Sequence, residues 1–190
     1  MSINIVLCGV GGQGTVLASK IMAKAAMNKG LKVMSAETIG MAQRGGSVFS
    51  FLKIGDDIES PMMGKGSADV ILGFEPGETV RMLPYLREGG AVIVNTRAVK
   101  PTTATLSGSD YSGEEMVEYL KKNVAGLTVV DGDKACEELG SSKVLNVVLL
   151  GAAVRTGKLG LSEEDVREAM KETVKEKFLP MNYKALEYAK

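Results

Sequence analysis

Histidine and tryptophan are absent from this 190-residue chain, and cysteine occurs only twice, as Cys8 and Cys136. Without histidine the chain cannot form a Ser-His-Asp or Cys-His catalytic site, nor an imidazole metal site. Two cysteines cannot supply the four thiolates that hold an iron–sulfur cluster. Both are interpreted as buried or neutral thiols of a reducing compartment. If the protein takes part in redox chemistry, another component must carry the electrons.

Net charge is also absent, because 23 Lys and Arg residues balance 23 Asp and Glu residues. With a pI near 6.4, the chain offers no electrostatic reason to expect nucleic acid or an anionic membrane as a partner. No apolar run reaches the roughly 18 residues that a membrane-spanning helix needs. The first residues, Met1 to Asn4, do not resemble a signal peptide. A cytoplasmic protein is therefore expected.

What the chain does contain is enough apolar sequence for a core, since 45% of its residues are hydrophobic and 24% are charged. Its length predicts one domain over residues 1–190. Buried-type strands are predicted at residues 3–8, 31–36, 47–54, 68–74, 91–95 and 127–130. Helices are predicted from residue 15 to a close at 28–30, and at 79–86, 114–122, 134–139, 144–156, 162–175 and 182–189.

Strands that alternate with helices indicate an α/β fold, here a three-layer Rossmann-like domain with a mainly parallel sheet and a helical C-terminal segment. The first strand, the turn after it, the helix and the second strand form one unit of about 35 residues, for which a right-handed crossover is expected. Pro180 is expected to divide the last two helices.

The turn at residues 9–14 reads G-V-G-G-Q-G and lies between the first strand and the first helix. This is the position of a dinucleotide-binding turn, in which glycines let the backbone approach a phosphate at a helix N-terminus. Glu37 follows at about the offset of an acidic residue that holds a ribose hydroxyl. The same glycines could serve close packing of strand and helix alone, so both interpretations stay open.

A second glycine loop at residues 41–47 reads M-A-Q-R-G-G-S. The guanidinium of Arg44 beside two glycines and a hydroxyl could grip a phosphate or carboxylate, or could order the loop against a partner. Both loops adjoin strands of the same half-sheet and are expected to meet at its carboxyl edge. The candidate cofactor-binding residues are Gly9, Gly11, Gly12, Gln13, Gly14, Thr15, Arg44, Gly45, Gly46 and Ser47, with no catalytic or metal-binding residue among them.

These two motifs resemble those of the gamma-type subunit of 2-oxoacid:ferredoxin oxidoreductases, and the second is worded most like the small subunit of the indolepyruvate branch. The resemblance covers the chain in length and element order, but its specific motifs lie in the first 55 residues. Members of that branch often have a histidine shortly after the second motif, where this chain has Phe51. The substrate branch is therefore open among indolepyruvate, which is favoured, pyruvate, 2-oxoglutarate and branched-chain 2-oxoacids.

The resemblance implies a subunit of a complex that oxidatively decarboxylates a 2-oxoacid to an acyl-CoA and CO2. In this family, thiamine diphosphate and iron–sulfur clusters lie on larger partner subunits, ferredoxin accepts the electrons, and the gamma-type chain helps to accommodate coenzyme A. This chain is expected to hold no such cofactor by itself, to be inactive alone, and to self-associate when isolated. Two alternatives from the residues remain, a small NAD(P)-binding reductase and a nucleotide-sensing module.

Overall fold

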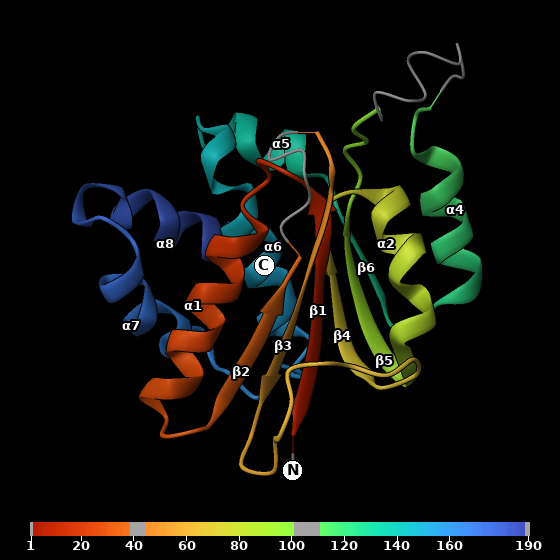
Figure 1. Cartoon of the computed structure of the whole chain (residues 1–190). Coiled ribbons are helices and arrows are strands. Elements are labelled where there is room, and N and C mark those ends of the chain that lie inside the picture. Colours follow the sequence, from red (N-terminus) through yellow and green to blue (C-terminus); the bar gives the residue numbers. More distant parts are fainter. Residues whose placement is uncertain (1, 39–44, 101–110, 189–190) are drawn as a thin grey trace.

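A computed structural model describes residues 2–38, 45–100 and 111–188, and Figure 1 shows them arranged around one twisted sheet. The sheet has six strands in the order β2-β3-β1-β4-β5-β6. The strands are β1 (Ile3–Val10), β2 (Val33–Glu37), β3 (Ser47–Ile54), β4 (Ala68–Gly73), β5 (Leu86–Asn95) and β6 (Leu127–Val130).

Five of the six strands run in one direction, and β3 is the exception. Strand β1 pairs in parallel with β4, β4 with β5, and β5 with β6, whereas β3 is antiparallel to both β1 and β2. The expectation of a mainly parallel sheet is confirmed. The order of the strands adds that β3 lies between β1 and β2, so the first two strands of the chain are not neighbours.

Helices cover both faces of the sheet, which confirms the three-layer α/β architecture (Figure 1). One face carries α1 (Thr15–Asn28), α6 (Leu145–Arg155), α7 (Glu163–Thr173) and α8 (Leu179–Tyr188), while the other carries α2 (Pro76–Met82) and α4 (Glu114–Asn123). The short helix α5 (Gly132–Glu138) follows β6 at the carboxyl end of the parallel strands.

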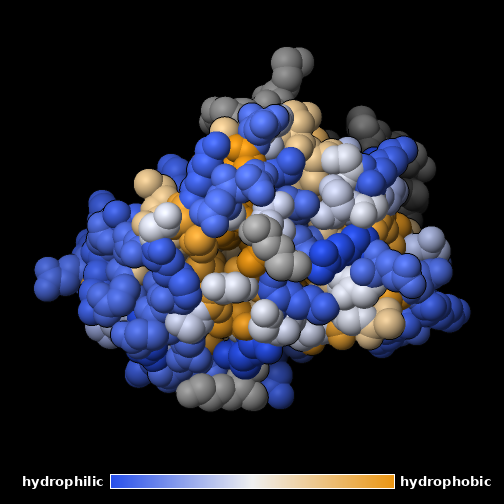
Figure 2. All heavy atoms as spheres, turned by 90° about the horizontal axis from the view of Figure 1, so that it is seen from below, coloured by the Kyte–Doolittle hydropathy of each residue, from blue (hydrophilic) through white to orange (hydrophobic). Residues whose placement is uncertain are grey.

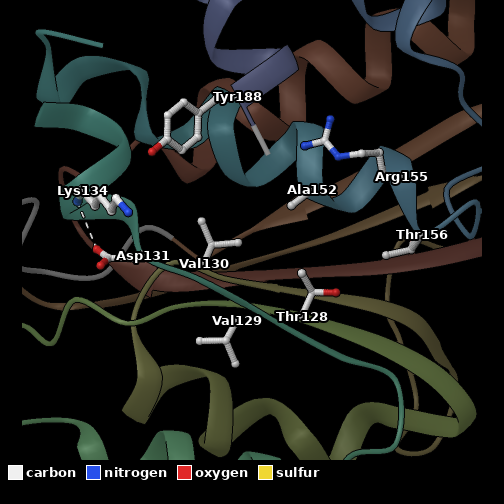
Figure 3. Close-up of a pocket in the computed structure, with 9 residues that line it drawn as sticks. All are labelled: Thr128, Val129, Val130, Asp131, Lys134, Ala152, Arg155, Thr156 and Tyr188. Atoms are coloured by element: carbon white, nitrogen blue, oxygen red, sulfur yellow. Dashed lines mark hydrogen bonds between the residues drawn. The ribbon is translucent and has the colours of Figure 1, made fainter. Parts of the chain in front are cut away.

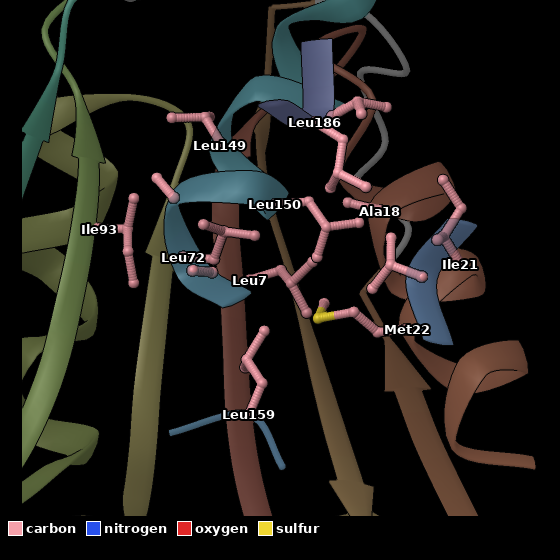
Figure 4. Close-up of a cluster of buried hydrophobic side chains, with 14 of the residues drawn as sticks. Leu7, Ala18, Ile21, Met22, Leu72, Ile93, Leu149, Leu150, Leu159 and Leu186 are labelled. Atoms are coloured by element: carbon pink, nitrogen blue, oxygen red, sulfur yellow. The ribbon is translucent and has the colours of Figure 1, made fainter. Parts of the chain in front are cut away.

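The central strands are buried on both faces, which explains their nearly continuous apolar sequences. Leu7, Leu72 and Ile93 point toward α1 and α6 and pack with Leu149, Leu150, Ile21 and Met22 in the larger core cluster (Figure 4). Val6, Ile71 and Val92 point the opposite way, into a smaller cluster beneath α2 and α4. The carboxyl ends of β1, β4 and β5 are thereby fixed in relation to one another, and the glycine turn begins from this rigid base.

Strand β2 begins two residues later than expected because Leu31 takes part in the turn that closes α1. Gly30 has a φ of 78°, its N–H bonds to the carbonyl of Met27, and the N–H of Leu31 bonds to the carbonyl of Ala26. This is the Schellman arrangement, which satisfies the last carbonyls of a helix.

Two proline positions correct the expected helix boundaries. Pro76 occupies the start of α2, where a missing N–H costs nothing, so the helix begins three residues before the expected Thr79 and gives way to a 3-10 turn at Leu83–Tyr85. Pro180 likewise lies in the first turn of α8. The expectation that it divides two helices is wrong, because the break falls at residues 174–178.

Figure 2 shows the end of the molecule at which the parallel strands begin, where hydrophilic residues surround separate apolar areas. The glycine loops lie at the opposite end of the sheet (Figure 1). None of the helices in the described ranges combines the length and the hydrophobicity that spanning a bilayer requires.

Candidate functional site

The two glycine loops meet at the carboxyl end of β1, as the sequence predicts. Val10, the last residue of β1, pairs with Ser47, the first residue of β3. The N–H of Gly11 donates to the carbonyl of Gly46 at 2.9 Å, and the N–H of Gly45 donates to the carbonyl of Gly11 at 3.4 Å. Arg44 and the rest of its motif at residues 41–43 lie outside the described residues.

The glycines of the first loop serve two different needs. Gly12 and Gly14 have φ values of 101° and 88°, a backbone conformation that residues with a Cβ rarely adopt. Gly9 instead has no room for a side chain, since a Cβ there would lie 2.6 Å from Oε1 of Gln13 and 2.7 Å from Cβ of Phe74. The turn therefore needs glycine for its shape at residues 12 and 14 and for close packing at residue 9.

Gln13 is a structural link in this turn. Its Oε1 accepts a hydrogen bond from the N–H of Val10 at 2.7 Å, and its Nε2 donates to the carbonyl of Phe74 at 3.0 Å. The same carbonyl accepts from Nδ2 of Asn95, whose Oδ1 accepts from the N–H of Gly132. This network, which we call the carboxamide latch, joins the ends of β1, β4, β5 and β6, and both ends of the Gln13 amide are engaged in it.

Ser47 faces a group of carboxylates at the start of α2. Its hydroxyl donates to Oε2 of Glu78 at 2.6 Å. Glu75 is 2% exposed, and its carboxylate accepts from the N–H of Glu78 and from the hydroxyl of Tyr111 at 2.5 Å. Burial and the Glu75 carboxylate raise the pKa of Tyr111 above its ordinary value. The Ser47 hydroxyl is thus committed to an acidic neighbour on the α2 side of the turn.

The two cysteines are free, and both are suited to remain protonated. Cys8 is buried, and burial raises the pKa of its thiol despite a hydrogen bond with Thr79. Burial also raises the pKa of Cys136, and the nearby charge of Asp133 adds to that rise. The burial expected for Cys8 is confirmed, and the raised pKa values favour the neutral thiol at both positions.

A cavity of about 600 Å³ lies on the other side of the glycine turn, between α1 and the ends of β2 and β3. Its volume falls within the range of about 300 to 1,000 Å³ that is typical of ligand pockets. The backbone of the turn and of α1, hydroxyl groups, an ammonium and a carboxylate line it. The lining residues are Gly11, Gly12, Gly14, Thr15, Val16, Leu17, Lys20, Glu37, Thr38, Val48 and Ser50.

The N-terminus of α1 opens into this cavity. Gly14 is its N-cap residue and has no side chain to accept from the first helical N–H groups, and its first turn holds no acidic residue. By contrast, Glu75, Asp131 and Ser162 cap α2, α5 and α7 with their side chains. Uncapped N–H groups at the positive end of a 14-residue helix favour an anion.

The sequence-based site and the cavity overlap only in part. Gly11, Gly12, Gly14 and Thr15 line the cavity, while Gly9, Gln13 and Ser47 do not. Gln13 instead borders a second hollow of about 380 Å³ near Arg97 and Lys143. Glu37 lies in the main cavity, as its offset from the glycines suggests.

Sequence reasoning missed Lys20 and Ser50 in the lining. Lys20 follows Thr15 by five positions on α1, and Ser50 is the buried polar residue of β3, at 3% exposure. That buried serine was the available signal.

A mainly parallel sheet with a glycine turn that leads into a helix at its carboxyl edge defines a Rossmann-like α/β protein. Comparison with protein families specifies this class further. The chain belongs to the pyruvate ferredoxin/flavodoxin oxidoreductase family, whose model matches residues 4–190.

Individual relatives agree with this assignment over nearly the full chain. Indolepyruvate oxidoreductase subunit IorB of Archaeoglobus fulgidus is 40% identical over 187 residues, which are 98% of this chain and 92% of the relative. The common gamma subunit of the pyruvate/ketoisovalerate oxidoreductases of Thermococcus kodakarensis is 34% identical, with coverages of 98% and 95%. The crystal structure of the keto/oxoacid ferredoxin oxidoreductase gamma subunit of Geobacter sulfurreducens matches with a TM-score of 0.70 at 25% identity, covering 98% of this chain and 95% of that one.

Proposed function

We propose that this chain is the small, gamma-type subunit of a 2-oxoacid:ferredoxin oxidoreductase, with an indolepyruvate-type 2-oxoacid favoured over pyruvate, 2-oxoglutarate and branched-chain acids. The observation that carries the proposal is the family match over residues 4–190, together with full-length similarity to an indolepyruvate oxidoreductase subunit. The complex converts the 2-oxoacid and coenzyme A to an acyl-CoA and CO2, and ferredoxin takes up the electrons. The whole chain acts in it as one cytoplasmic domain.

The contribution proposed for this chain is binding and shape. Thiamine diphosphate and iron–sulfur clusters are assigned to larger companion subunits. Two cysteines, one of them buried, suit that assignment, because a cluster needs four thiolates. Among the described residues, no group of three or more carboxylates or thiols is placed to hold a metal ion.

The cavity of about 600 Å³ beside the glycine turn supports coenzyme A as the ligand of this chain. The free N–H groups of α1 and the ammonium of Lys20 suit a phosphate, while the carboxylate of Glu37 suits a ribose hydroxyl. Gly12 and Gly14 allow the backbone to approach the ligand closely. Gly45 and Gly46 form hydrogen bonds with Gly11 of the same turn, and Arg44, which precedes them in the sequence, is proposed to join the phosphate site.

The subunit proposal is tested by co-expressing the chain with the product of its neighbouring gene and purifying the complex by gel filtration. A stable complex that turns over a 2-oxoacid, together with an isolated chain that does not, is the expected result. Turnover by the isolated chain, or failure to form any complex, would contradict the proposal.

The coenzyme A site is tested by calorimetric titration of the complex with coenzyme A. Lys20→Gln is expected to weaken binding about tenfold, because it removes a cation from the cavity. Lys24→Gln is the matched control, since Lys24 lies one turn further along α1 and pairs with Glu172 at 2.7 Å outside the cavity. Equal losses of affinity in the two variants would contradict a coenzyme A site in this cavity. Saturable micromolar binding of NADH, with none of coenzyme A, would favour the reductase alternative.

A further inference from the structure

A second region of the molecule, remote from the glycine turn, combines an open sheet edge with a cavity. Among the strands that the structure describes, β6 is the last of the sheet and has β5 as its one neighbour. A cavity of about 460 Å³ runs beside it, bounded by β6, α5, α6 and the end of α8 (Figure 3). The lining residues are Thr128, Val129, Val130, Asp131, Lys134, Ala152, Arg155, Thr156 and Tyr188.

The outer edge of β6 offers backbone groups for another strand. The carbonyl of Gly126 accepts from the N–H of Val92 in β5, and that of Val130 accepts from the N–H of Thr96, the residue after β5. Because successive residues of a strand direct their backbone groups to opposite sides, the N–H and C=O of Val129 point away from β5. Figure 3 shows the side chain of Val129 on one face of the strand and those of Thr128 and Val130 on the other, facing the cavity.

Arg155 supplies a charge that the described part of the chain leaves without a carboxylate at ion-pair distance. One of its guanidinium nitrogens donates to the carbonyl of Leu186 at 3.1 Å. Partial burial lowers the pKa of Arg155, and Glu163, the carboxylate that opposes this shift, bonds to Arg167.

The other titratable groups at the cavity leave the Arg155 guanidinium available. Asp131 accepts from the N–H of Lys134 as the cap of α5. Tyr188 donates to Glu138 at 2.7 Å. Lys134 adds a second cation at the end of the cavity opposite Arg155 (Figure 3). A carboxylate that enters beside Arg155 therefore meets a cation whose remaining donors form no ion pair with any residue in the described ranges.

We propose that β6 is the docking edge for an extended segment of the companion subunit, which adds a strand beside Val129 and places an acidic side chain against Arg155. Backbone hydrogen bonds to an exposed edge supply affinity in such an arrangement, and pockets for alternate side chains supply specificity. Thr128 and Val130 direct their side chains toward the cavity. The acidic side chain of the added strand must therefore lie on that same face of the sheet, toward α6, to reach Arg155. A second copy of this chain is disfavoured as the occupant, because its own β6 has only four residues, Leu127–Val130, and none of them is acidic. The occupant rests on the proposed function, since it belongs to the companion subunit.

Hydrogen exchange tests the strand directly, in the isolated chain and in the purified complex. The amide of Val129 is expected to exchange rapidly in the isolated chain and at least about tenfold more slowly in the complex. A complex that forms normally but leaves this amide unprotected overturns the docking edge and leaves the proposed function intact. Absence of any complex overturns both. Protection already present in the isolated chain, with a dimer in light scattering, assigns the edge to a second copy and overturns the companion segment.

Substitutions test the two halves of the proposal separately. Val129→Pro removes the outward N–H without touching the bonds between β5 and β6, and is expected to weaken the complex at least about tenfold. Val129→Thr, which keeps the N–H, is expected to bind as the natural chain does.

Arg155→Gln is expected to weaken the complex at least about tenfold, and Arg155→Lys is expected to restore part of the loss. Arg81→Gln makes the same change of charge on α2, where the side chain is 68% exposed, and serves as the control. If the Arg155→Gln variant binds the companion subunit as tightly as the Arg81→Gln variant does, the proposed acidic contact is overturned. Because Arg155 is solvent-accessible, this variant tests the proposal even if Val129→Pro fails to fold.

Discussion

The two sides of the glycine turn differ in how their polar groups are used. On the α2 side, the carboxamide of Gln13, the hydroxyl of Ser47 and the carboxylate of Glu75 all have partners within the protein. On the α1 side, the first N–H groups of the helix lack a side-chain cap and open into the 600 Å³ cavity with Lys20. The glycine turn therefore has a structural half on its α2 side and a half on its α1 side whose polar groups are available to a ligand, so substitutions in the two halves should have separable effects.

The largest expected effect distinguishes two glycines of the same turn. Gly9→Ala should lower the free energy of unfolding by about 3 kcal/mol, because its Cβ has no space between Gln13 and Phe74. Gly12→Ala should cost about 1 to 2 kcal/mol, because a Cβ there meets nothing within 4 Å and only the positive φ is strained. Urea denaturation followed by circular dichroism measures both. Equal losses would show that the two positions are not different in kind.

The next effect tests the carboxamide latch. Gln13→Ala should lower the free energy of unfolding by about 2 kcal/mol, because it leaves the N–H of Val10 without its partner at a partly buried site. Asn28→Ala, which removes an amide that bonds to Glu172 on the surface, is the control and should change stability by less than about 0.5 kcal/mol. If the two variants unfold at the same urea concentration, the latch does not stabilise the turn.

Tyr111, on the α2 side of the turn, should make the free energy of unfolding depend on pH in the alkaline range. Its pKa is raised in the folded chain, so above pH of about 10 the unfolded state releases a proton that the folded state keeps. Stability from this group is complete below pH 10 and falls as pH rises, by up to about 1.4 kcal/mol per pH unit. Tyr111→Phe should remove this contribution, which unfolding curves between pH 9 and 11 would detect. An unchanged slope would contradict the contact with Glu75.

The smallest effect is expected at Ser47. Ser47→Ala should cost about 1 kcal/mol, because it removes one hydrogen bond to Glu78, and it should leave the affinity for coenzyme A unchanged within twofold. Thr15→Val also removes one hydroxyl group, here within the cavity. It should weaken the binding of coenzyme A while changing the free energy of unfolding little. Calorimetric titration of both variants in the complex compares the two halves. If Ser47→Ala weakens the binding of coenzyme A and Thr15→Val does not, the α2 side of the turn is the ligand-binding side.

Most of the fold follows from patterns that a sequence makes visible. The runs at residues 47–54 and 127–130 match β3 and β6 in full, because β-branched and aromatic side chains favour strands even where, as in β6, most of the strand is not buried. The position of β3 between β1 and β2 has no local signal, since strand order depends on contacts distant in sequence. The expectation for Pro180 was wrong because proline occurs both beyond the end of a helix and within its first turn.

The site was predictable as a place and less so as a set of side chains. Glycine spacing identified the turn, and the meeting of the two loops followed from the strands that they adjoin. The structural role of Gln13 could not be predicted in this way, because its hydrogen-bond partners, Val10 and Phe74, are brought together by the ends of two strands. Lys20 enters the lining through the direction that α1 takes from the turn.

The antiparallel insertion of β3 has a consequence for when the cavity exists. Its walls come from α1 on one side and from the ends of β2 and β3 on the other, so it is complete only after that hairpin has docked along β1. Partial opening of this edge pair would dismantle the pocket while the parallel strands stay assembled. Ligand occupancy and the integrity of one hairpin are therefore thermodynamically coupled, and whatever fills the cavity also clamps the margin of the sheet.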